Sequence, residues 1–549
     1  MPSVRILAGA PEHVPQEAII ENARKEFCVT KTVMKMKKII LLILSAVMLL
    51  SCVTSCKPKN PQPSGSETPI VSGEPTSSAS QTENTDASST PDATPSETLP
   101  DTKTEFEKIG IPNVNYQEAT IYVFHWDAGY PEFEVDRLEN DGDPILDAIY
   151  KRNLYTEQLL NVELDFTEEL GNGNNQKEFA DALSRRIENP DTPVDIVSAY
   201  GRTMGVVTLS GLLTDLYEYD SLDFSKEWWP KDMQNEYKIK DRLYFISGDI
   251  STNLLHMMYA IYYNLDLAEK FGVGDLVSKV NNLDWTLDDL IRCSSGVYQD
   301  MSGDGKSDDD FFGAAFAFFH MDALVLGCNF RLAEPSEKEG EAIRFTDEFF
   351  GETFGEFIDK MIAWVHSNDV LNDNTYSGSA DPAFLDSRAI FRISTAGYGA
   401  NLKKSDLNFG ILPSPMLNKE QGRYYTCIAN GFSAYGICRK SPDGDRAATV
   451  MQTMGYYGKT LTTPAIFEVT YQGKLSVTGE YMGMFEIIRD SISFDIGRIY
   501  HLQLNVLADY PTNEAISKGR PWSVVMGPFT KNNLNNLMKK LNISLLALD

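Results

Sequence analysis

The sequence predicts an α/β fold made of two lobes, and two observations support this prediction. Apolar, strand-like segments alternate with amphipathic helical segments, a pattern typical of parallel sheets with helices on both faces. The alternation also continues over a length that exceeds one usual domain. We therefore expect two lobes, each a mostly parallel sheet flanked by helices.

The first part of this pattern alternates strictly and with short connections. Expected strands lie at 119–124, 162–166 and 194–198, and expected helices at 144–160 and 175–188. A strand–helix–strand–helix–strand order with short links indicates parallel neighbours in one sheet.

The later elements follow less regularly. Further strands are expected at 243–247, 257–263, 389–393, 409–412 and within 431–438, and helices at 265–271, from 285 and from 445 onward. At the helix that starts near Trp285, Thr286 is the expected N-cap, with Asp288 and Asp289 in the first turn.

An export signal precedes this folded part. Three lysines at 35, 37 and 38 are followed by the apolar run 39–50, which has signal-peptide length. The run is shorter than the roughly 20 apolar residues of a membrane-spanning helix. Cys52 and Cys56 each follow small residues, which resembles the lipobox of bacterial lipoproteins. We expect a lipid anchor on one of them, with Cys52 preferred because it directly follows the apolar run.

The segments on either side of the signal have distinct interpretations. Residues 1–33 precede the expected signal peptide 34–52 and are interpreted as an over-long gene prediction. Residues 53–105 are rich in Ser, Thr, Pro and acidic residues, with few large apolar side chains. Such a segment buries too little surface to fold, so we expect a disordered tether.

Composition and motifs exclude several function classes. The formal net charge of −29 repels phosphate backbones, so nucleic acid is not an expected partner. Seven scattered cysteines fit neither a disulfide framework nor a zinc site. The sequence has no nucleophile elbow, metalloprotease motif, P-loop or dinucleotide fingerprint, and its six histidines are far apart. We expect no enzyme; a glycosidase with two carboxylates is the alternative considered.

One acidic segment, Asp300–Asp310, has the spacing of a calcium-binding loop. Its oxygen groups at positions 1, 3, 5 and 9, with glycine at position 6, are typical of such loops. Phe311 stands where helix–loop–helix sites have a bidentate Glu. The loop therefore predicts either a structural Ca²⁺ site or a bare acidic turn. The candidate metal-binding positions are Asp300, Ser302, Asp304, Lys306 and Asp308.

Several motifs, in order, resemble the family-1 extracellular solute-binding lipoproteins of clostridial and bacillar type. They are Val194–Val197 with Ser210–Leu216, Trp228-Trp229 with Asp241–Tyr244, Tyr262–Leu267, Asp284–Asp288 and Phe409–Pro415. The resemblance covers roughly residues 116–510 and implies a type II periplasmic-binding-protein-like fold with a hinge and an inter-lobe cleft. It implies a first lobe of 106–250 plus 425–475 and a second of 251–424 plus 476–549.

Candidate ligand-binding residues follow the expected strands, because open α/β sheets bind ligands beyond the carboxyl ends of their strands. Trp126 and Asp127 follow the first strand, and Tyr200 and Arg202 follow the third. In the second lobe, the resemblance favours Tyr398 as the facing aromatic residue. Asn430 lies near a later crossing and completes the set: Trp126, Asp127, Tyr200, Arg202, Tyr398 and Asn430. The alternative is that these side chains pack in the interior or lie in surface loops.

The resemblance implies a membrane-anchored binding component of an ABC importer that takes a small ligand, most simply a sugar or oligosaccharide, outside the cell. Its expected partners are the permease subunits, and its only membrane contact is the N-terminal lipid. The alternative is a surface lipoprotein that binds a peptide or glycan for adhesion or sensing. No cofactor is expected beyond the structural Ca²⁺.

Overall fold

The computed structural model describes residues 102–133, 142–373, 378–403, 405–471 and 480–548. The expected signal peptide, Cys52 and Cys56 lie outside these ranges. Residues 94–549 form one compact unit. The first described helix, α2 (Thr102–Ile109), begins inside the segment that we predicted as tether up to residue 105. Among the described residues, no helix is long and apolar enough to cross a membrane.

The first lobe is built on a four-stranded sheet with the order β12-β3-β1-β2. β1 (Ala119–Trp126) pairs in parallel with β2 (Val162–Glu169) and with β3 (Ile196–Tyr200). β12 (Ser433–Ile437) returns late in the chain and pairs antiparallel with β3. Three parallel strands from consecutive strand–helix units confirm the strand–helix alternation predicted for this region.

The second lobe is built on a five-stranded sheet with the order β10-β4-β9-β5-β8. The strands β5 (Phe312–Ala317), β8 (Val370–Asp373) and β9 (Ala389–Thr395) run parallel. β4 (Tyr259–Asn264) lies antiparallel between β9 and β10 (Phe409–Leu412). Four short strands form two further two-stranded sheets among the described residues. β6 (Ala333–Pro335) pairs with β7 (Ile343–Phe345), and β11 (Thr426–Cys427) pairs with β13 (Ile492–Ser493).

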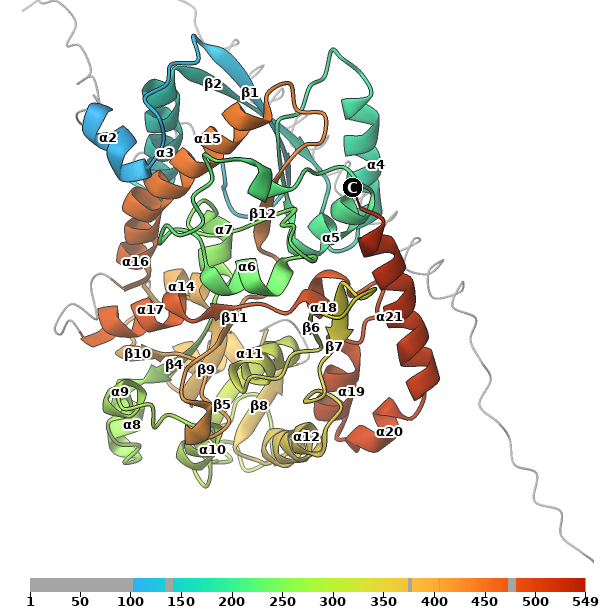
Figure 1. Cartoon of the computed structure of the whole chain (residues 1–549). Helices are drawn as coiled ribbons and strands as arrows, with labels where there is room; N and C mark the ends of the chain where they lie inside the picture. The colour runs from blue at the N-terminus through green and yellow to red at the C-terminus, as the bar shows by residue number, and fades with distance from the viewer. Residues whose placement is uncertain (1–101, 134–141, 374–377, 404, 472–479, 549) are drawn as a thin grey trace, which may run out of the picture. The chain divides into compact units, whose positions relative to one another are not determined.

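Helices pack around both sheets (Figure 1). Those of the first lobe are α3 (Pro144–Leu160), α4 (Gln176–Ile187), α5 (Gly201–Leu209), α6 (Lys231–Tyr237), α7 (Thr252–His256), α15 (Gly444–Tyr457) and α16 (Thr463–Tyr471). Those of the second lobe are α8 (Leu265–Lys270), α9 (Leu276–Asn281), α10 (Leu287–Ser294), α11 (Met321–Gly327), α12 (Glu352–Val365), α13 (Ala380–Leu385), α14 (Gly399–Lys403) and α17 (Glu480–Asp490). The C-terminal helices are α18 (Ile496–Ile499), α19 (Tyr510–Lys518), α20 (Trp522–Met526) and α21 (Lys531–Leu546).

Local sequence signals explain where two of the predicted helices begin and end. Helix α3 starts after Asp143, whose carboxylate accepts from the amides of Ile145 and Leu146, and ends at Asn161 in the left-handed region. Helix α10 starts at a capping box in which Thr286 and Asp289 bond to each other's backbone amides. Both helices are confirmed with the predicted boundaries to within two residues.

The chain crosses between the two sheets through three described connections. The first runs from 247 to 258, the second from 428 to 432, and the third from 458 to 491, apart from 472–479, which lie outside the described ranges. In Figure 1, α15 and α16 follow each other along α3, and α17 lies beside β10 of the second sheet. The third crossing therefore packs against both lobes.

The structure differs from two sequence predictions. Residues 243–247 were expected as a strand, but only Ile246 makes a bridge, to Tyr435, because this segment leaves the first sheet to begin the first crossing. The strand β5 was not predicted at all. Its sequence FGAAFA consists of Phe, Gly and Ala and is buried on both faces, so it shows no apolar–polar alternation. It also contains none of the β-branched residues that favour strands.

Candidate functional site

Four strands end on loops that face the space between the two sheets. In the first lobe, β1 ends at Trp126 and β3 ends at Tyr200. In the second lobe, β5 ends at Ala317 and β9 at Thr395, and each is followed by a short 3-10 helix, η2 (Phe318–His320) or η3 (Ala396–Tyr398). In open α/β sheets this is the edge where ligands bind.

Charged side chains from both lobes join at this edge. Arg202, on α5 just after β3, donates to the carboxylate of Asp509, which precedes α19. Arg498, on α18, donates to Asp322 at 2.6 Å and to Asn430 at 2.8 Å, and its other amino group lies 3.7 Å from Asp509. Asp322 belongs to α11 of the second lobe, so the network links the two lobes.

Burial controls the electrostatics of this network. Asp322 and Arg498 are almost completely buried. Burial raises the pKa of Asp322, against the opposing effect of Arg498. Burial alone would also raise the pKa of Asp509, but Arg498 and Arg202 beside it hold that pKa below its ordinary value. The two arginines therefore keep Asp509 ionised inside the protein.

A neutral histidine lies next to the ion pairs. The Nε2 atom of His501 is 3.3 Å from the side-chain nitrogen of Gln176, which begins α4 in the first lobe. Burial, reinforced by Arg202, lowers the pKa of His501 to about 4. We name the seven residues of this region the interlobe polar cluster: Gln176, Arg202, Asp322, Asn430, Arg498, His501 and Asp509.

Several buried polar atoms of this cluster have no hydrogen-bond partner among the described residues. The four atoms in the cluster are Gln176 Oε1, Arg202 Nε, His501 Nδ1 and Asp509 Oδ1. Two more buried polar atoms without a partner belong to Thr512 and Asn513, in the first turn of α19 after Asp509. Polar atoms of this kind cost free energy unless water or a ligand satisfies them, so the cluster is a candidate for binding hydroxyl groups. The cavity that Arg202, Asn430 and Arg498 line has a volume of about 10 Å³ in this structure, so a sugar needs the lobes to move apart before it can enter.

Partly exposed aromatic rings lie on the segments that follow β1 and β5. Tyr130, in the loop after β1, is 40% exposed, and its ring lies 4.6 Å from that of His256. Its hydroxyl is 3.4 Å from the position that a Cβ would occupy at Gly397, in η3 of the second lobe. Phe318 and Phe319, directly after β5, are half-buried, with their rings 5.4 Å apart. Flat apolar faces beside polar groups are the usual composition of a small-ligand site.

The structure brings together Arg202 and Asn430, two of the six ligand-binding residues predicted from sequence. Tyr200 lies two residues before Arg202, and burial raises the pKa of Tyr200. Trp126 packs behind Tyr200, with ring centroids 5.3 Å apart, and its indole N–H donates to Ser433 at 2.9 Å. Trp126 is only 5% exposed, so its ring is part of the first-lobe core.

The other two predicted residues point elsewhere. Tyr398 is 5% exposed and packs against Tyr262 and the Arg392 guanidinium of the second lobe. This burial contradicts the expectation that its ring is free in an open cleft, because η3 turns it back onto β4 and β9. Asp127 is exposed and accepts from the amide of Gly129 in its own loop. Ligand contact by either residue stays a prediction.

The acidic segment 300–310 forms a turn whose carboxylates bond to its own backbone. Asp300 accepts from the amides of Gly303 and Gly305, and Asp310 accepts from Met301, Ser307 and the Tyr298 hydroxyl. The Lys306 ammonium group leaves the loop and donates to the carbonyls of Ser367 and Val370. Among the described residues, no group of three acidic, histidine or cysteine side chains is placed to hold a metal ion.

Sequence reasoning missed Gln176, Asp322, Arg498, His501, Asp509 and Tyr130. Arg498 and Asp322 are 176 positions apart and pair only because the segment after the third crossing folds back between the lobes. No local motif marks such a pair. Tyr130 had a usable signal, since it belongs to the same loop after β1 that suggested Trp126 and Asp127.

Comparison with known proteins identifies the fold. No family model and no curated protein matches the chain. A cyclo/maltodextrin-binding protein complexed with maltotetraose is similar in structure, with a TM-score of 0.51 and 13% identity over 77% of this chain and 97% of that chain. An ABC substrate-binding protein from Listeria monocytogenes in complex with cycloalternan is 14% identical over 77% of this chain and 99% of its own, with a TM-score of 0.47.

The similarity to the cyclo/maltodextrin-binding protein, with its TM-score of 0.51, establishes the architecture. The chain has the two-lobe, periplasmic-binding-protein-like α/β fold, which confirms the predicted fold class.

Proposed function

We propose that this protein is the solute-binding component of an ABC importer and captures a sugar or oligosaccharide between its two lobes. The observation that carries the proposal is the interlobe polar cluster. In it, buried polar atoms without a partner among the described residues gather where the C-terminal segment meets the first lobe, and Arg498 links them to Asp322 of the second lobe. A sugar supplies many hydroxyl groups that both donate and accept, so it satisfies carboxylates, guanidinium groups and amides together. Tyr130, Phe318 and Phe319 supply apolar faces for the sugar rings.

The comparison with a maltodextrin-binding protein supports the same ligand class. Ligands of periplasmic-binding-protein-like folds lie between lobes that close around them, and such hinge closure needs a ligand with higher affinity for the closed state. Arg202 and Asp322 come from different lobes and are linked through Arg498 and Asp509, so a ligand bonded to this network contacts both lobes at once.

A panel of sugars tests the proposal directly. We expect one or more of maltotetraose, cyclic glucans, raffinose and galacto-oligosaccharides to raise the melting temperature of the full chain. A ligand at 100 times its Kd adds about 2.7 kcal/mol of stability. Peptides of matched size are the comparison ligands. Stabilisation by peptides alone would overturn the sugar proposal in favour of another solute, and no stabilisation by any sugar would also overturn it.

Export and anchoring are part of the proposal and rest on the sequence. The basic and apolar run before Cys52 and Cys56 supports secretion and lipidation at one of these cysteines. Labelled palmitate is expected to be incorporated into the wild type and not into the Cys52→Ala/Cys56→Ala variant. Incorporation that survives both changes would contradict a lipid anchor at these positions.

A structural Ca²⁺ at the acidic segment 300–310 is a further proposal, supported by its oxygen spacing alone. The side chains of Asp300, Asp304 and Asp308 would hold the ion if they turned away from their present partners. This ion would have no part in ligand capture.

A further inference from the structure

We infer that the protein has a second ligand site, in a cavity at the hinge, that binds a small organic anion with an apolar body. The cavity has a volume of about 860 Å³, within the range of sites for small molecules. It is separate from the interlobe polar cluster, because none of the seven cluster residues lines it.

The cavity lies where the crossings between the lobes come together. Gly248, Asp249, Leu254 and Leu255 belong to the first crossing, and helices α16 and α17 of the third crossing form the opposite wall. Arg423, just before the second crossing, reaches the rim and pairs with Asp232. An occupant of this cavity therefore touches the segments about which the lobes move.

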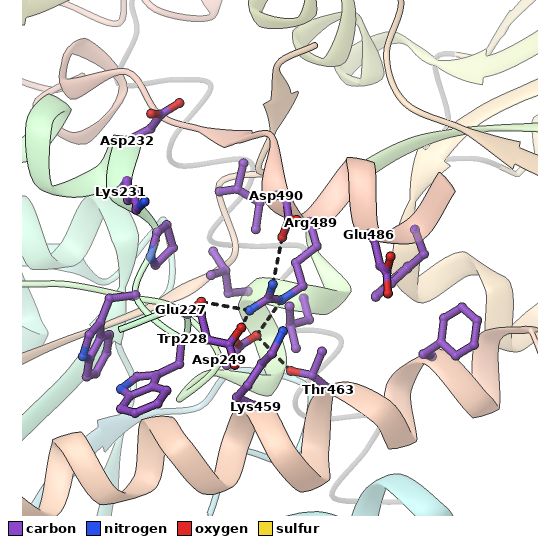
Figure 2. Close-up of a pocket in the computed structure, with 18 of the residues that line it drawn as sticks. Glu227, Trp228, Lys231, Asp232, Asp249, Lys459, Thr463, Glu486, Arg489 and Asp490 are labelled. Carbon is purple, nitrogen blue, oxygen red and sulfur yellow. Dashed lines mark hydrogen bonds and ion pairs between the residues drawn. The ribbon is translucent and has the colours of Figure 1, made fainter. Parts of the chain in front are cut away.

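A π-helical turn shapes the floor of the cavity. The turn η5 (Gly458–Thr462) joins α15 to α16 and lies directly on the first crossing. A side chain at Gly458 would place its Cβ 1.9 Å from the carbonyl oxygen of Asp249, so only glycine allows this approach. π-Helical turns are rare and occur frequently at functional sites. Here the turn directs Lys459 into the cavity (Figure 2).

The acidic group on the floor of the cavity, Asp249, is already paired with an arginine. Asp249 is 2% exposed, and its carboxylate accepts two hydrogen bonds from Arg489 and one, at 2.9 Å, from the Thr463 hydroxyl. Arg489 also donates to Asp490 and to the carbonyl of Glu227, as Figure 2 shows. The Arg489 guanidinium group is thus already paired with acidic and carbonyl groups of the protein.

Lys459 is the less exposed of the two lysines that line the cavity. Its ammonium group has no hydrogen bond or ion pair with any residue in the described ranges, and its side chain is half-buried. The carboxylates of Glu227 and Glu486 also line the cavity, but both residues are exposed and solvated at its rim. A half-buried cation gains more from an ionic partner than an exposed one does, because water screens it less.

The apolar wall of the cavity determines the chemistry of the uncharged part of the ligand. Leu254, Leu255, Pro464, Phe467 and Phe485 also line the cavity and give it an apolar surface. Phe467 and Phe485 have ring centroids 5.4 Å apart. A charge-assisted bond to Lys459 combined with apolar burial against this wall selects an aryl or alkyl carboxylate over a sugar.

The test uses 3-phenylpropionate as the probe, titrated calorimetrically into the full chain. 3-Phenylpropanol has the same body without the charge and is expected to bind at least tenfold more weakly. Lys459→Met is expected to weaken 3-phenylpropionate binding about tenfold or more, whereas Lys459→Arg retains it. Lys231→Met is the matched control, because Lys231 lines the same cavity at its exposed rim, and we expect a change of less than about twofold.

Three results would overturn the inference: no binding of 3-phenylpropionate to the wild type, equal binding of the acid and the alcohol, or unchanged binding in Lys459→Met. A folding defect in Lys459→Met leaves the acid–alcohol comparison in the wild type as the deciding measurement. Sugar binding is measured on the same variants and is expected to stay unchanged. Loss of the hinge site and failure of the sugar proposal are therefore separate outcomes.

Discussion

The interlobe polar cluster and the hinge cavity use the same kinds of side chain to opposite effect. In the cluster, charges are buried and paired, and the unsatisfied atoms are neutral or belong to paired groups. In the hinge cavity, one ion pair closes the floor, and Lys459 has no partner among the described residues and lies beside an open volume. The cluster therefore suits a neutral ligand with many hydroxyl groups, and the cavity suits an ion.

This difference also separates two roles of charged side chains, which are stabilising the arrangement of the lobes and binding a ligand. Ion pairs between lobes stabilise one lobe arrangement whether or not a ligand is present, so Arg498 stabilises the arrangement seen in this structure. A lysine without a partner contributes nothing until an anion arrives. The predictions below test the comparison in order of decreasing effect.

The largest effect is expected from Arg498→Met. The change leaves the carboxylates of Asp322 and Asp509 buried with fewer partners, and breaking a buried ion pair in this way costs about 3–5 kcal/mol. Arg489→Met at the hinge is the matched variant and is expected to cost less, because Thr463 remains bonded to Asp249. Urea unfolding monitored by tryptophan fluorescence measures both. Equal losses would remove the energetic distinction between the two regions.

The second prediction concerns the buried rings. Trp126→Ala and Tyr398→Ala are each expected to lower the free energy of unfolding by about 3–5 kcal/mol, since both rings are packed in a lobe core. Tyr130→Ala is expected to cost under about 1 kcal/mol, because its ring is 40% exposed. Stable, well-folded Trp126→Ala and Tyr398→Ala proteins that bind sugar weakly would instead restore these two rings as free cleft residues.

The third prediction assigns the sugar-stacking ring. Tyr130→Ala is expected to weaken oligosaccharide binding about tenfold, because a stacked ring contributes about 1.5–3 kcal/mol of apolar burial, and 1.4 kcal/mol is one decade of affinity. Tyr217→Ala is the control, since Tyr217 is a first-lobe tyrosine with a similar exposure of 43% and lies outside the candidate site. Equal affinities of the two variants in calorimetry would mean that Tyr130 is not in the sugar site.

The sequence predicted the architecture well because architecture depends on repeated local patterns. The helix 144–160 and the strands β1, β2 and β10 follow directly from apolar periodicity and caps such as Asp143. The strand β5 was missed because a run of small, fully buried residues carries no period.

The site was predicted only in part, because binding groups meet through tertiary folding. The rule that loops after strands bind ligands found Arg202 and the neighbourhood of Tyr130. It did not distinguish Trp126, which turns into the core, from Tyr130 four residues later, which does not. Arg498 and Asp509 lie on no strand end at all and reach the site only through the fold of the C-terminal segment.

The fourth prediction is a pH dependence from His501. Its pKa is about 4 in the folded protein and close to 6.5 when unfolded, so the unfolded state binds the proton more readily. The stability from this residue is fully present above about pH 6.5 and is lost as the pH falls toward 4. Between pH 7 and 5, the wild type is expected to lose about 1–2 kcal/mol more than His501→Gln. Parallel stability curves in urea unfolding would show that His501 is solvated.

The smallest effect is expected at the acidic segment 300–310, which extends the comparison to exposed charges. Asp300 and Asp310 already accept backbone amides, so an ion arriving there replaces bonds instead of adding all of its own. If Ca²⁺ binds, chelation with EGTA is expected to lower the melting temperature by only about 1–3 °C. Asp304→Ala is expected to remove that response, because among the described residues Asp304 accepts a hydrogen bond only from Ser302 and can turn toward an ion. Glu352→Ala, another exposed acidic change on the second lobe, is expected to keep it. An identical melt with and without chelator would mean that the amide bonds of Asp300 and Asp310 are sufficient, and that the calcium-like spacing reflects only the geometry of a tight acidic turn.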